Sequence, residues 1–307
     1  MNNTHCRIAC VGEAMVELAL DPAGTTARVG FAGDTLNTAI YLVREMPGIH
    51  NVAFVSAIGT DTMSDRMVDF IEAEGISTDQ LLRVDDRLPG IYAINTDDHG
   101  ERTFAYWREN SAARTLFQKG SGADFSVLED FDVIYLSAIT LAILPPTIRD
   151  ALFDWIKSFR DNGGLFAFDS NYRPRLWDNE DIARDVVSAA WRLCDIALPS
   201  IDDEMALFGD VDEASVLARI DACGVRTGAL KRGAKGPIPI NAPINPSLVF
   251  APATKVVDTT AAGDSFNGGF LAAFLAGHSL DEAMMAGHNR AALVVGCRGA
   301  IAPRDML

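Results

Sequence analysis

Residues 133–169, VIYLSAITLAILPPTIRDALFDWIKSFRDNGGLFAFD, decide the fold class. They contain an apolar run of strand length at Val133–Ser137, a helical segment at Pro146–Arg160 and a second apolar run at Leu165–Asp169. The alternation continues with helices expected at Glu180–Leu193, Asp202–Phe208, Glu213–Ala222, Ala262–Ala276 and Leu280–Val295, and strands at Asp195–Leu198 and Thr227–Lys231. Strands alternating with helices imply right-handed crossovers. The sequence therefore predicts an α/β fold with a mostly parallel central sheet and helices on both faces.

The N-terminal third adds a different pattern. Buried strands are expected at Cys6–Val11 and Val52–Ile58, and helices at Asp34–Met46 and Thr62–Glu74. Short alternating runs occur at Met15–Leu20 and Ala27–Phe31, and again at Gly90–Asn95 and Thr103–Trp107 around a turn at Asp97–Gly100. We expect one domain over residues 1–307, because no low-complexity linker divides it. Hairpins from about 15–31 and 80–108 would form a small separate sheet.

Composition excludes several classes of function. The 42 acidic and 26 basic residues give a formal net charge of −16, which repels phosphate backbones and anionic lipid. We therefore expect neither nucleic-acid nor membrane binding. Five scattered cysteines without a Cys-x-x-Cys pair favour reduced thiols and a cytoplasmic protein. No apolar stretch approaches the roughly 20 residues that span a bilayer.

The strongest chemical signal is DTTAAGDSFNGG at Asp258–Gly269. Ala261, Ala262 and Gly263 lead directly into an apolar helix, and such small residues leave the first-turn N–H groups open to an anion. Asp264 lies beside this anion pocket, where a carboxylate could accept the proton of a hydroxyl that attacks a phosphate. Taken alone, Asp264 is equally compatible with a first-turn acid that complements the helix dipole.

Two weaker segments fit the same chemistry. Gly33-Asp-Thr-Leu-Asn37 opens a helix and offers the polar side chains of Asp34 and Asn37 on one face, as a polyol site requires. In isolation, a plain N-cap by Asp34 explains this segment better. Leu230-Lys-Arg-Gly-Ala-Lys-Gly236 ends a strand with basic residues and glycines, which suits a nucleotide phosphate and an ordinary turn equally.

Together, in this order and spacing, these segments resemble the ribokinase-like (PfkB) carbohydrate kinases. The resemblance covers nearly the whole chain, and the segments that carry it further are Gly33–Thr38, Leu88–Tyr92, Gly100–Phe104, Tyr106–Arg108, Asp169–Trp177 and Arg298–Ala300. It implies that the small sheet closes over the sugar as a lid and excludes water. It also implies ATP and Mg²⁺ as cofactors, and makes a homo-oligomer, with a dimer through the lid, the expected assembly.

The resemblance assigns roles to individual residues. Asp264 would be the catalytic base, with the anion hole supplied by Ala261, Ala262 and Gly263. Sugar contacts are expected from Gly33, Asp34, Asn37, Tyr92, Tyr106, Arg108 and Arg173. The ATP site would comprise Asn171, Ser200, Lys231, Gly233, Gly236 and Asn289. Asp203 or Glu204 would serve the metal, although the family's Asn-x-x-Glu segment appears here as Ser200-Ile-Asp-Asp-Glu204 and its register is open. Where the family has paired glycines, this chain has Ala32-Gly33.

Two arginines indicate the substrate class. In an acidic protein, Arg108 and Arg173 could hold a carboxylate, although arginines are more often solvated surface residues. The resemblance is to the sugar-acid branch of the family, and it implies phosphorylation of 2-keto-3-deoxygluconate at its 6-hydroxyl. Fructose, ribose or another sugar of the same family remains an alternative substrate, and so does a non-catalytic sugar-binding regulator. A dinucleotide-dependent oxidoreductase is disfavoured, because no Gly-x-Gly-x-x-Gly follows the first strand.

Overall fold

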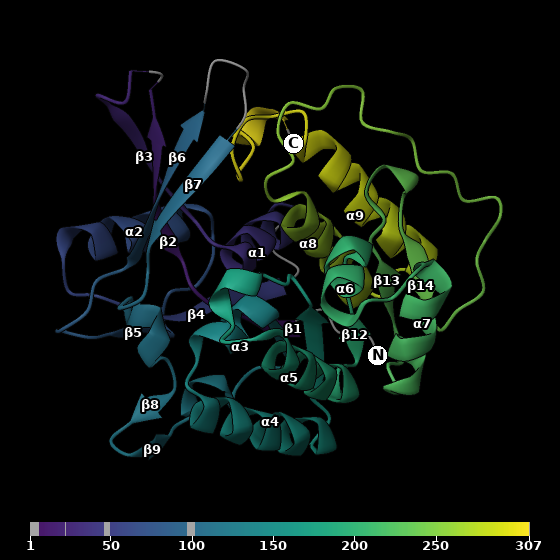
Figure 1. Cartoon of the computed structure of the whole chain (residues 1–307), viewed down its shortest axis with the longest axis horizontal. Coiled ribbons are helices and arrows are strands. Elements are labelled where there is room, and N and C mark those ends of the chain that lie inside the picture. The colour runs from purple at the N-terminus through teal and green to yellow at the C-terminus, as the bar shows by residue number, and fades with distance from the viewer. Residues whose placement is uncertain (1–5, 22, 46–49, 97–101, 307) are drawn as a thin grey trace.

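The predicted parallel sheet forms the centre of the molecule (Figure 1). The structure is a computed structural model that describes residues 6–21, 23–45, 50–96 and 102–306. The strand order is β14-β13-β12-β11-β10-β1-β4-β5, and only the β13–β14 pair is antiparallel. The strands are β1 (Cys6–Val11), β4 (His50–Ile58), β5 (Leu81–Arg83), β10 (Val133–Ser137), β11 (Leu165–Asp169), β12 (Ile196–Ala197), β13 (Thr227–Leu230) and β14 (Ile238–Ile240). The predicted fold class is confirmed.

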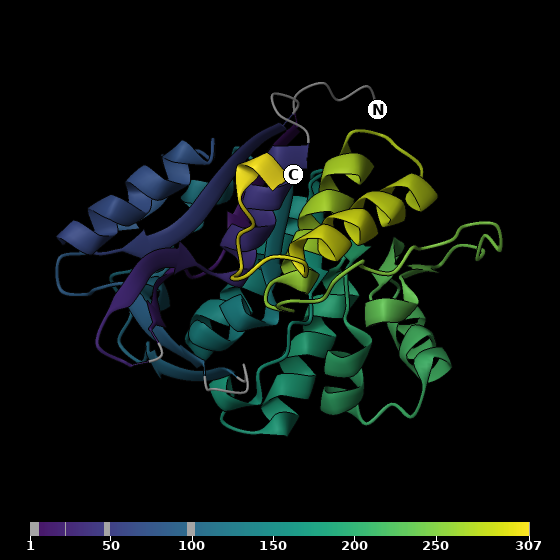
Figure 2. The ribbon, with the colours of Figure 1, turned by 90° about the horizontal axis from the view of Figure 1, so that it is seen from above.

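Helices cover both faces of this sheet, as Figure 2 shows from above. They are α1 (Asp34–Glu45), α2 (Thr62–Ala73), α3 (Ala138–Ile143), α4 (Pro146–Asp161), α5 (Glu180–Leu193), α6 (Ile201–Phe208), α7 (Glu213–Ala222), α8 (Ala262–Leu275) and α9 (Leu280–Val294). Successive side chains of β1 point to opposite faces. Ile8 and Cys10 pack in one core with residues of α1, α2, α8 and α9, whereas Ala9 and Val11 pack in the other with α3, α4, α5, α6 and α7.

A second sheet of four strands stands beside the first, at the upper left of Figure 1. It contains β2 (Met15–Leu20), β3 (Ala27–Ala32), β6 (Gly90–Thr96) and β7 (Arg102–Trp107), in the order β3-β2-β6-β7. The turn predicted at Asp97–Gly100 lies outside the described residues. A third, two-stranded sheet pairs β8 (Gln118–Lys119) with β9 (Gly122–Ala123). The role of the four-stranded sheet as a lid stays a prediction.

Smaller features differ from expectation. The helix α3 was not predicted, because its six residues are apolar except for Thr140 and show no helical period. Ser137 caps it by accepting a hydrogen bond from the N–H of Ile139. Single 3-10 turns lie at Ala112–Thr115, Ser126–Leu128, Pro174–Leu176, Gly233–Lys235 and Arg304–Met306. Within the described part of the chain, no helix has the length and apolarity required to cross a membrane.

Gly33 lets two segments approach closely at the start of α1. A Cβ atom built on it would lie 2.0 Å from the carbonyl oxygen of Glu13, so no larger residue fits without moving the backbone. The glycine therefore positions the first turn of α1 against the segment that leaves β1. This turn carries Asp34 and Asn37 toward the carboxyl ends of the parallel strands, where ligands bind in open α/β sheets.

Candidate active site

The first turn of α8 has the open N-terminus that the sequence predicts. Ala261, its N-cap residue, has a left-handed backbone conformation with φ 60° and provides no side-chain cap. The N–H of Ala262 donates to the carbonyl of Thr259. The N–H groups of Gly263 and Asp264 have no hydrogen-bond partner among the described residues. Two donors and the positive end of the helix dipole therefore remain available to an anion.

Asp264 is held on this turn by residues of α1. Its Oδ2 accepts a hydrogen bond from Nδ2 of Asn37 at 2.9 Å, and its carbonyl accepts one from Oγ1 of Thr38 at 3.2 Å. Burial raises the pKa of Asp264 to about 7, and the nearby charges of Asp34 and Asp169 add to this, whereas the Asn37 bond opposes it. A carboxyl group with a pKa near neutrality can accept a proton and release it again under physiological conditions.

Asp34 is fixed by two other elements. Its Oδ2 accepts hydrogen bonds from Oγ of Ser137, at the end of β10, and from Nδ2 of Asn171 at 2.8 Å. Asn171 has a positive φ of 24°, and its N–H donates to Oδ1 of Asp169 at 3.1 Å. Asn171, predicted on the nucleotide side, thus contacts the residue predicted to bind sugar. The side chain of Asp34 has a set orientation, as selective binding of a hydroxyl requires.

Lys231 forms the cationic part of the same cluster. Its Nζ lies 2.7 Å from Oδ2 of Asp169 and 3.0 Å from Oδ1 of Asn267, and both partners are buried. A Cβ built on Gly263 would lie 3.5 Å from this Nζ, so the ammonium group lies beside the open turn of α8. Nδ2 of Asn267 also donates to Asp169 at 2.6 Å and to the hydroxyl of Tyr135 at 3.0 Å.

Sequence reasoning missed three members of this cluster as site residues: Asp169, Asn267 and Tyr135. A signal existed for two of them. Asp169 follows an apolar strand directly, and Asn267 stands three residues after Asp264, on the same face of α8. Tyr135 lies within a strand of five buried residues and could not be distinguished from an ordinary core residue.

The second sheet contributes residues whose side chains are already paired. The hydroxyl of Tyr92 donates to Glu17, and its ring stacks on Tyr106 with 5.9 Å between the ring centroids. Arg108 is buried and forms an ion pair with Glu13, which is also buried. Nε of Arg108 and Oε1 of Glu13 have no hydrogen-bond partner among the described residues. Buried polar atoms without a partner are unusual, and these two are enclosed by the protein in this conformation.

The family model for "pfkB family carbohydrate kinase" matches residues 6–306. This chain belongs to that family. It is 42% identical to the 2-dehydro-3-deoxygluconokinase of Escherichia coli K12 over 306 residues, which cover 98% of each chain. It is also 42% identical to the 2-dehydro-3-deoxygluconokinase of Dickeya dadantii, over 99% of each chain. A crystal structure of a PfkB protein from Polaromonas sp. JS666 superimposes with a TM-score of 0.83 at 24% identity and 98% coverage of both chains.

The residues that this carbohydrate kinase would use around a metal lie at the start of α6. Arg173 is half exposed, and its Nη1 lies 3.5 Å from Oδ1 of Asp203. Burial raises the pKa of Asp203 to about 6. Glu204 is completely buried and pairs with Arg219 at 2.8 Å, so its carboxylate is directed into the protein. Asp203 is therefore the more accessible of the two residues predicted for the metal, and its role as a magnesium contact stays a prediction. The backbone of Ser200, next to this turn, is bridged to Lys231.

No group of three or more acidic, histidine or cysteine side chains able to hold a metal occurs among the residues that the structure describes. A magnesium ion held through water and substrate phosphates, with one carboxylate nearby, is compatible with this arrangement. Asp203 fits that requirement.

Three predicted ATP-site residues lie outside the hydrogen-bonded cluster. After β13, Gly233 begins a 3-10 turn and Gly236 directly follows it, with φ of 57° and 75°. A Cβ on Gly236 would lie 2.6 Å from the ring of Phe250, which gives this glycine a packing reason of its own. Asn289 is exposed on α9. Their nucleotide contacts stay predictions.

Proposed function

We propose that this kinase transfers the γ-phosphoryl group of ATP to the 6-hydroxyl of 2-keto-3-deoxygluconate, also called 2-dehydro-3-deoxygluconate. The observation that carries the proposal is the position of the Asp264 carboxylate beside two unpaired N–H groups at the start of α8. The names of relatives that are 42% identical over the full length supply the substrate. A hydroxyl and a phosphate brought to this turn would meet between a base and an anion hole.

The residues of the cluster suggest the course of the reaction. Asn37 and Asp34 would hold the sugar so that its hydroxyl lies against Asp264, whose carboxylate accepts the hydroxyl proton. The oxygen would then form a bond to the γ-phosphorus while the bond to the β-phosphate oxygen of ADP breaks. The N–H groups of Gly263 and Asp264, with Lys231 beside them, would stabilise the charge on the transferred group. Magnesium, when bound near Asp203, would neutralise phosphate charge.

Arg108 and Arg173 support an acidic sugar as the substrate. Both are cations within the part of the chain where sugar binding is proposed, and Arg173 is half exposed. The unpaired Nε of buried Arg108 offers a further donor. A charge-assisted bond to a carboxylate is worth roughly 1.5–3 kcal/mol, which corresponds to roughly a tenfold to hundredfold preference over an uncharged analogue.

A substrate panel tests the proposal. ADP release would be measured with 2-keto-3-deoxygluconate, gluconate, fructose and ribose, in the wild type and in Arg173→Ala. We expect the sugar acid to be turned over best, and Arg173→Ala to raise its KM tenfold or more without a matching effect on fructose. A similar loss for both sugars would remove the carboxylate role from Arg173. Fructose as the preferred substrate would refute the sugar-acid assignment.

The four-stranded sheet is also proposed to act as a lid and as a dimer surface in a cytoplasmic protein. On its edge strand β7, Phe104 and Tyr106, which are 38% and 44% exposed, stack on one face, and Trp107, which is 58% exposed, lies on the other face. All five cysteines are free, which suits a reducing compartment. Light scattering after size-exclusion chromatography, compared between the wild type and Trp107→Lys, would test the assembly. A monomeric wild type would contradict it.

A further inference from the structure

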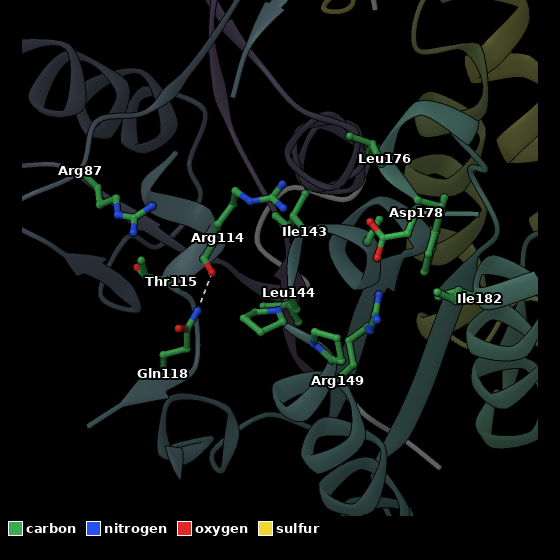
Figure 3. Close-up of a pocket in the computed structure, with 14 residues that line it drawn as sticks. Arg87, Arg114, Thr115, Gln118, Ile143, Leu144, Arg149, Leu176, Asp178 and Ile182 are labelled. Atoms are coloured by element: carbon green, nitrogen blue, oxygen red, sulfur yellow. Dashed lines mark hydrogen bonds between the residues drawn. The ribbon is translucent and has the colours of Figure 1, made fainter. Parts of the chain in front are cut away.

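An arginine-lined cavity of about 310 Å³ lies at the C-terminal end of α3, where Ala142 and Ile143 form part of its lining (Figure 3). Arg87, Arg114 and Arg149 line it, together with one carboxylate, Asp178. None of the residues that surround Asp264 takes part in its lining. Ser137, which contacts Asp34, caps the start of α3, whereas Ile143 at the other end lines the cavity. Six helical residues separate these ends, a length of about 9 Å.

None of the guanidinium groups of this cavity forms an ion pair with the described residues, whereas other partly buried arginines, such as Arg44 and Arg219, do. Arg87 and Arg114 are half-buried, and their side chains have no ion pair or hydrogen bond with the described residues. Arg149 is only 8% exposed. Its Nη1 donates to the carbonyl of Leu141 at 3.3 Å, and no carboxylate of the described chain lies within ion-pair distance.

Arg149 is therefore a buried cation without an ion-pair partner, although the nearby carboxylates of Asp150 and Asp178 favour its charged form and partly oppose the effect of burial on its pKa. Its guanidinium lies over the ring of Trp177, 5.4 Å from the centroid, and burial lowers its pKa because the charged form is poorly solvated. Nε1 of Trp177, which also lines the cavity, is buried and has no hydrogen-bond partner among the described residues. The Trp177 nitrogen has almost no accessible surface, so the indication of a missing acceptor rests on Arg149 and on the two other unpaired guanidinium groups that line the same cavity.

The charge of the cavity indicates the kind of acceptor. Three guanidinium groups and one carboxylate leave a formal charge of +2 in a protein whose net charge is −16. A phosphate group carries about −1.5 to −2 charges at pH 7 and offers three strong acceptor oxygens. The planar guanidinium group matches phosphate oxygens with paired N–H donors. The volume exceeds what one phosphate requires and leaves space for a small organic group.

We propose that this cavity is a second anion site, which binds a small phosphate, free or esterified, independently of the catalytic cluster. Figure 3 shows that the guanidinium groups of Arg114 and Arg149 reach the cavity from two different parts of the chain. Arg114 comes from the 3-10 turn that precedes β8, and Arg149 from the first turns of α4. A ligand between them would connect α4 to the segment that follows the second sheet.

Isothermal titration calorimetry tests the site in the full-length protein. Inorganic phosphate, glucose 6-phosphate and glucose would be titrated in the presence of Mg²⁺ and a saturating non-hydrolysable ATP analogue, so that the turn at Asp264 is already occupied. We expect the two phosphates to bind and glucose not to bind. Tighter binding of glucose 6-phosphate identifies an esterified ligand, and tighter binding of inorganic phosphate identifies the free ion.

Two substitutions locate the binding. Arg87→Gln and Arg114→Gln each remove a half-buried cation without breaking a contact, so both variants should fold and retain turnover. Each should raise the Kd for phosphate about tenfold, because each removes a charge-assisted interaction. Arg66→Gln removes the same charge from the exposed face of α2 and should change the Kd less than twofold. No binding up to about 10 mM phosphate, an unchanged Kd in both cavity variants, or loss of binding caused by the ATP analogue would each overturn the proposal.

Discussion

Asp264→Asn should stabilise the protein while it abolishes turnover. The pKa of Asp264 rises from 3.8 to about 7 in the folded state, chiefly because the carboxyl is buried and secondly because Asp34 is close. In the unfolded chain this side chain ionises with an ordinary pKa. The folded state therefore binds a proton more strongly, and the wild type loses stability as the pH rises from about 4 to about 7.

The size of the effect follows from the shift. A difference of about three pKa units, at 1.36 kcal/mol per unit, lowers the free energy of unfolding of the wild type by about 4 kcal/mol at pH 8. This is an upper bound, because the residue as a whole keeps partial solvent exposure although its carboxyl group is enclosed, and solvent screens part of its charge. At pH 5, which lies only about one unit above the pKa of the unfolded chain, the free energy of unfolding is lowered by about 2 kcal/mol. Asparagine does not titrate, so the stability advantage of the variant should shrink toward acid pH.

Urea unfolding of both proteins at pH 5 and pH 8, followed by tryptophan fluorescence and circular dichroism, measures this difference. The variant's midpoint should exceed that of the wild type by more at pH 8 than at pH 5, with equal m-values. Asp69→Asn, which changes an exposed carboxyl of α2, serves as the control and should shift neither midpoint. A variant that is less stable at pH 8, or a gap that is independent of pH, would refute the view that Asp264 is a buried base with a raised pKa.

Three further outcomes are expected. With saturating MgATP, kcat/KM for the sugar acid should fall about tenfold per pH unit below pH 7 and be constant above it, because the base must be ionised. A kcat/KM that does not change from pH 5.5 to 8 would exclude Asp264 as the group whose ionisation limits the rate. Lys231→Met should destabilise the protein by about 3 kcal/mol and raise the KM for ATP, since it leaves Asp169 buried without its cation; urea unfolding and ATP titration measure the two effects, with Lys231→Arg as the conservative comparison. Arg102→Ala should lower the free energy of unfolding by about 2 kcal/mol, because Arg102 of β7 pairs with Asp258, which lies just before α8 and has a side chain that is 4% exposed. An unchanged urea midpoint would contradict this.

The fold could be predicted because its signals are local. Apolar runs of strand length alternate with amphipathic helices such as α4 and α5, and this alternation determines the parallel sheet. The exceptions are elements without a distinctive period. Helix α3 consists almost entirely of apolar residues, and β14 contains Pro239 on an antiparallel edge strand, where a missing N–H donor is tolerated. Neither pattern distinguishes helix, strand and loop without the surrounding structure.

The site could be predicted only in part, because pairings between distant segments leave no periodic signal. Asp264 and Asn37 were singled out from two separate motifs, and they lie within hydrogen-bond distance of each other. By contrast, nothing in the sequence indicated that Arg108 pairs with Glu13, 95 residues away. The partner of Glu204 was equally hidden, since Arg219 lies on the next helix. The sequence therefore identified the charged residues, whereas it did not identify the ion-pair partners that decide whether those residues are free to bind a ligand.

The raised pKa of Asp264 and the binding of a polyanion depend on opposite charges within one cluster. Asp34 and Asp169 add negative potential, which makes Asp264 a stronger base than an isolated carboxylate. The same potential would repel ATP phosphates if nothing opposed it. Lys231 pairs with Asp169 and lies beside Gly263, so its charge opposes the acidic field at the helix start, and it also lowers the pKa of Asp264 in part. The first turn of α8 therefore combines a cation and two unpaired N–H groups, which favour phosphate, with a carboxylate that can accept a proton.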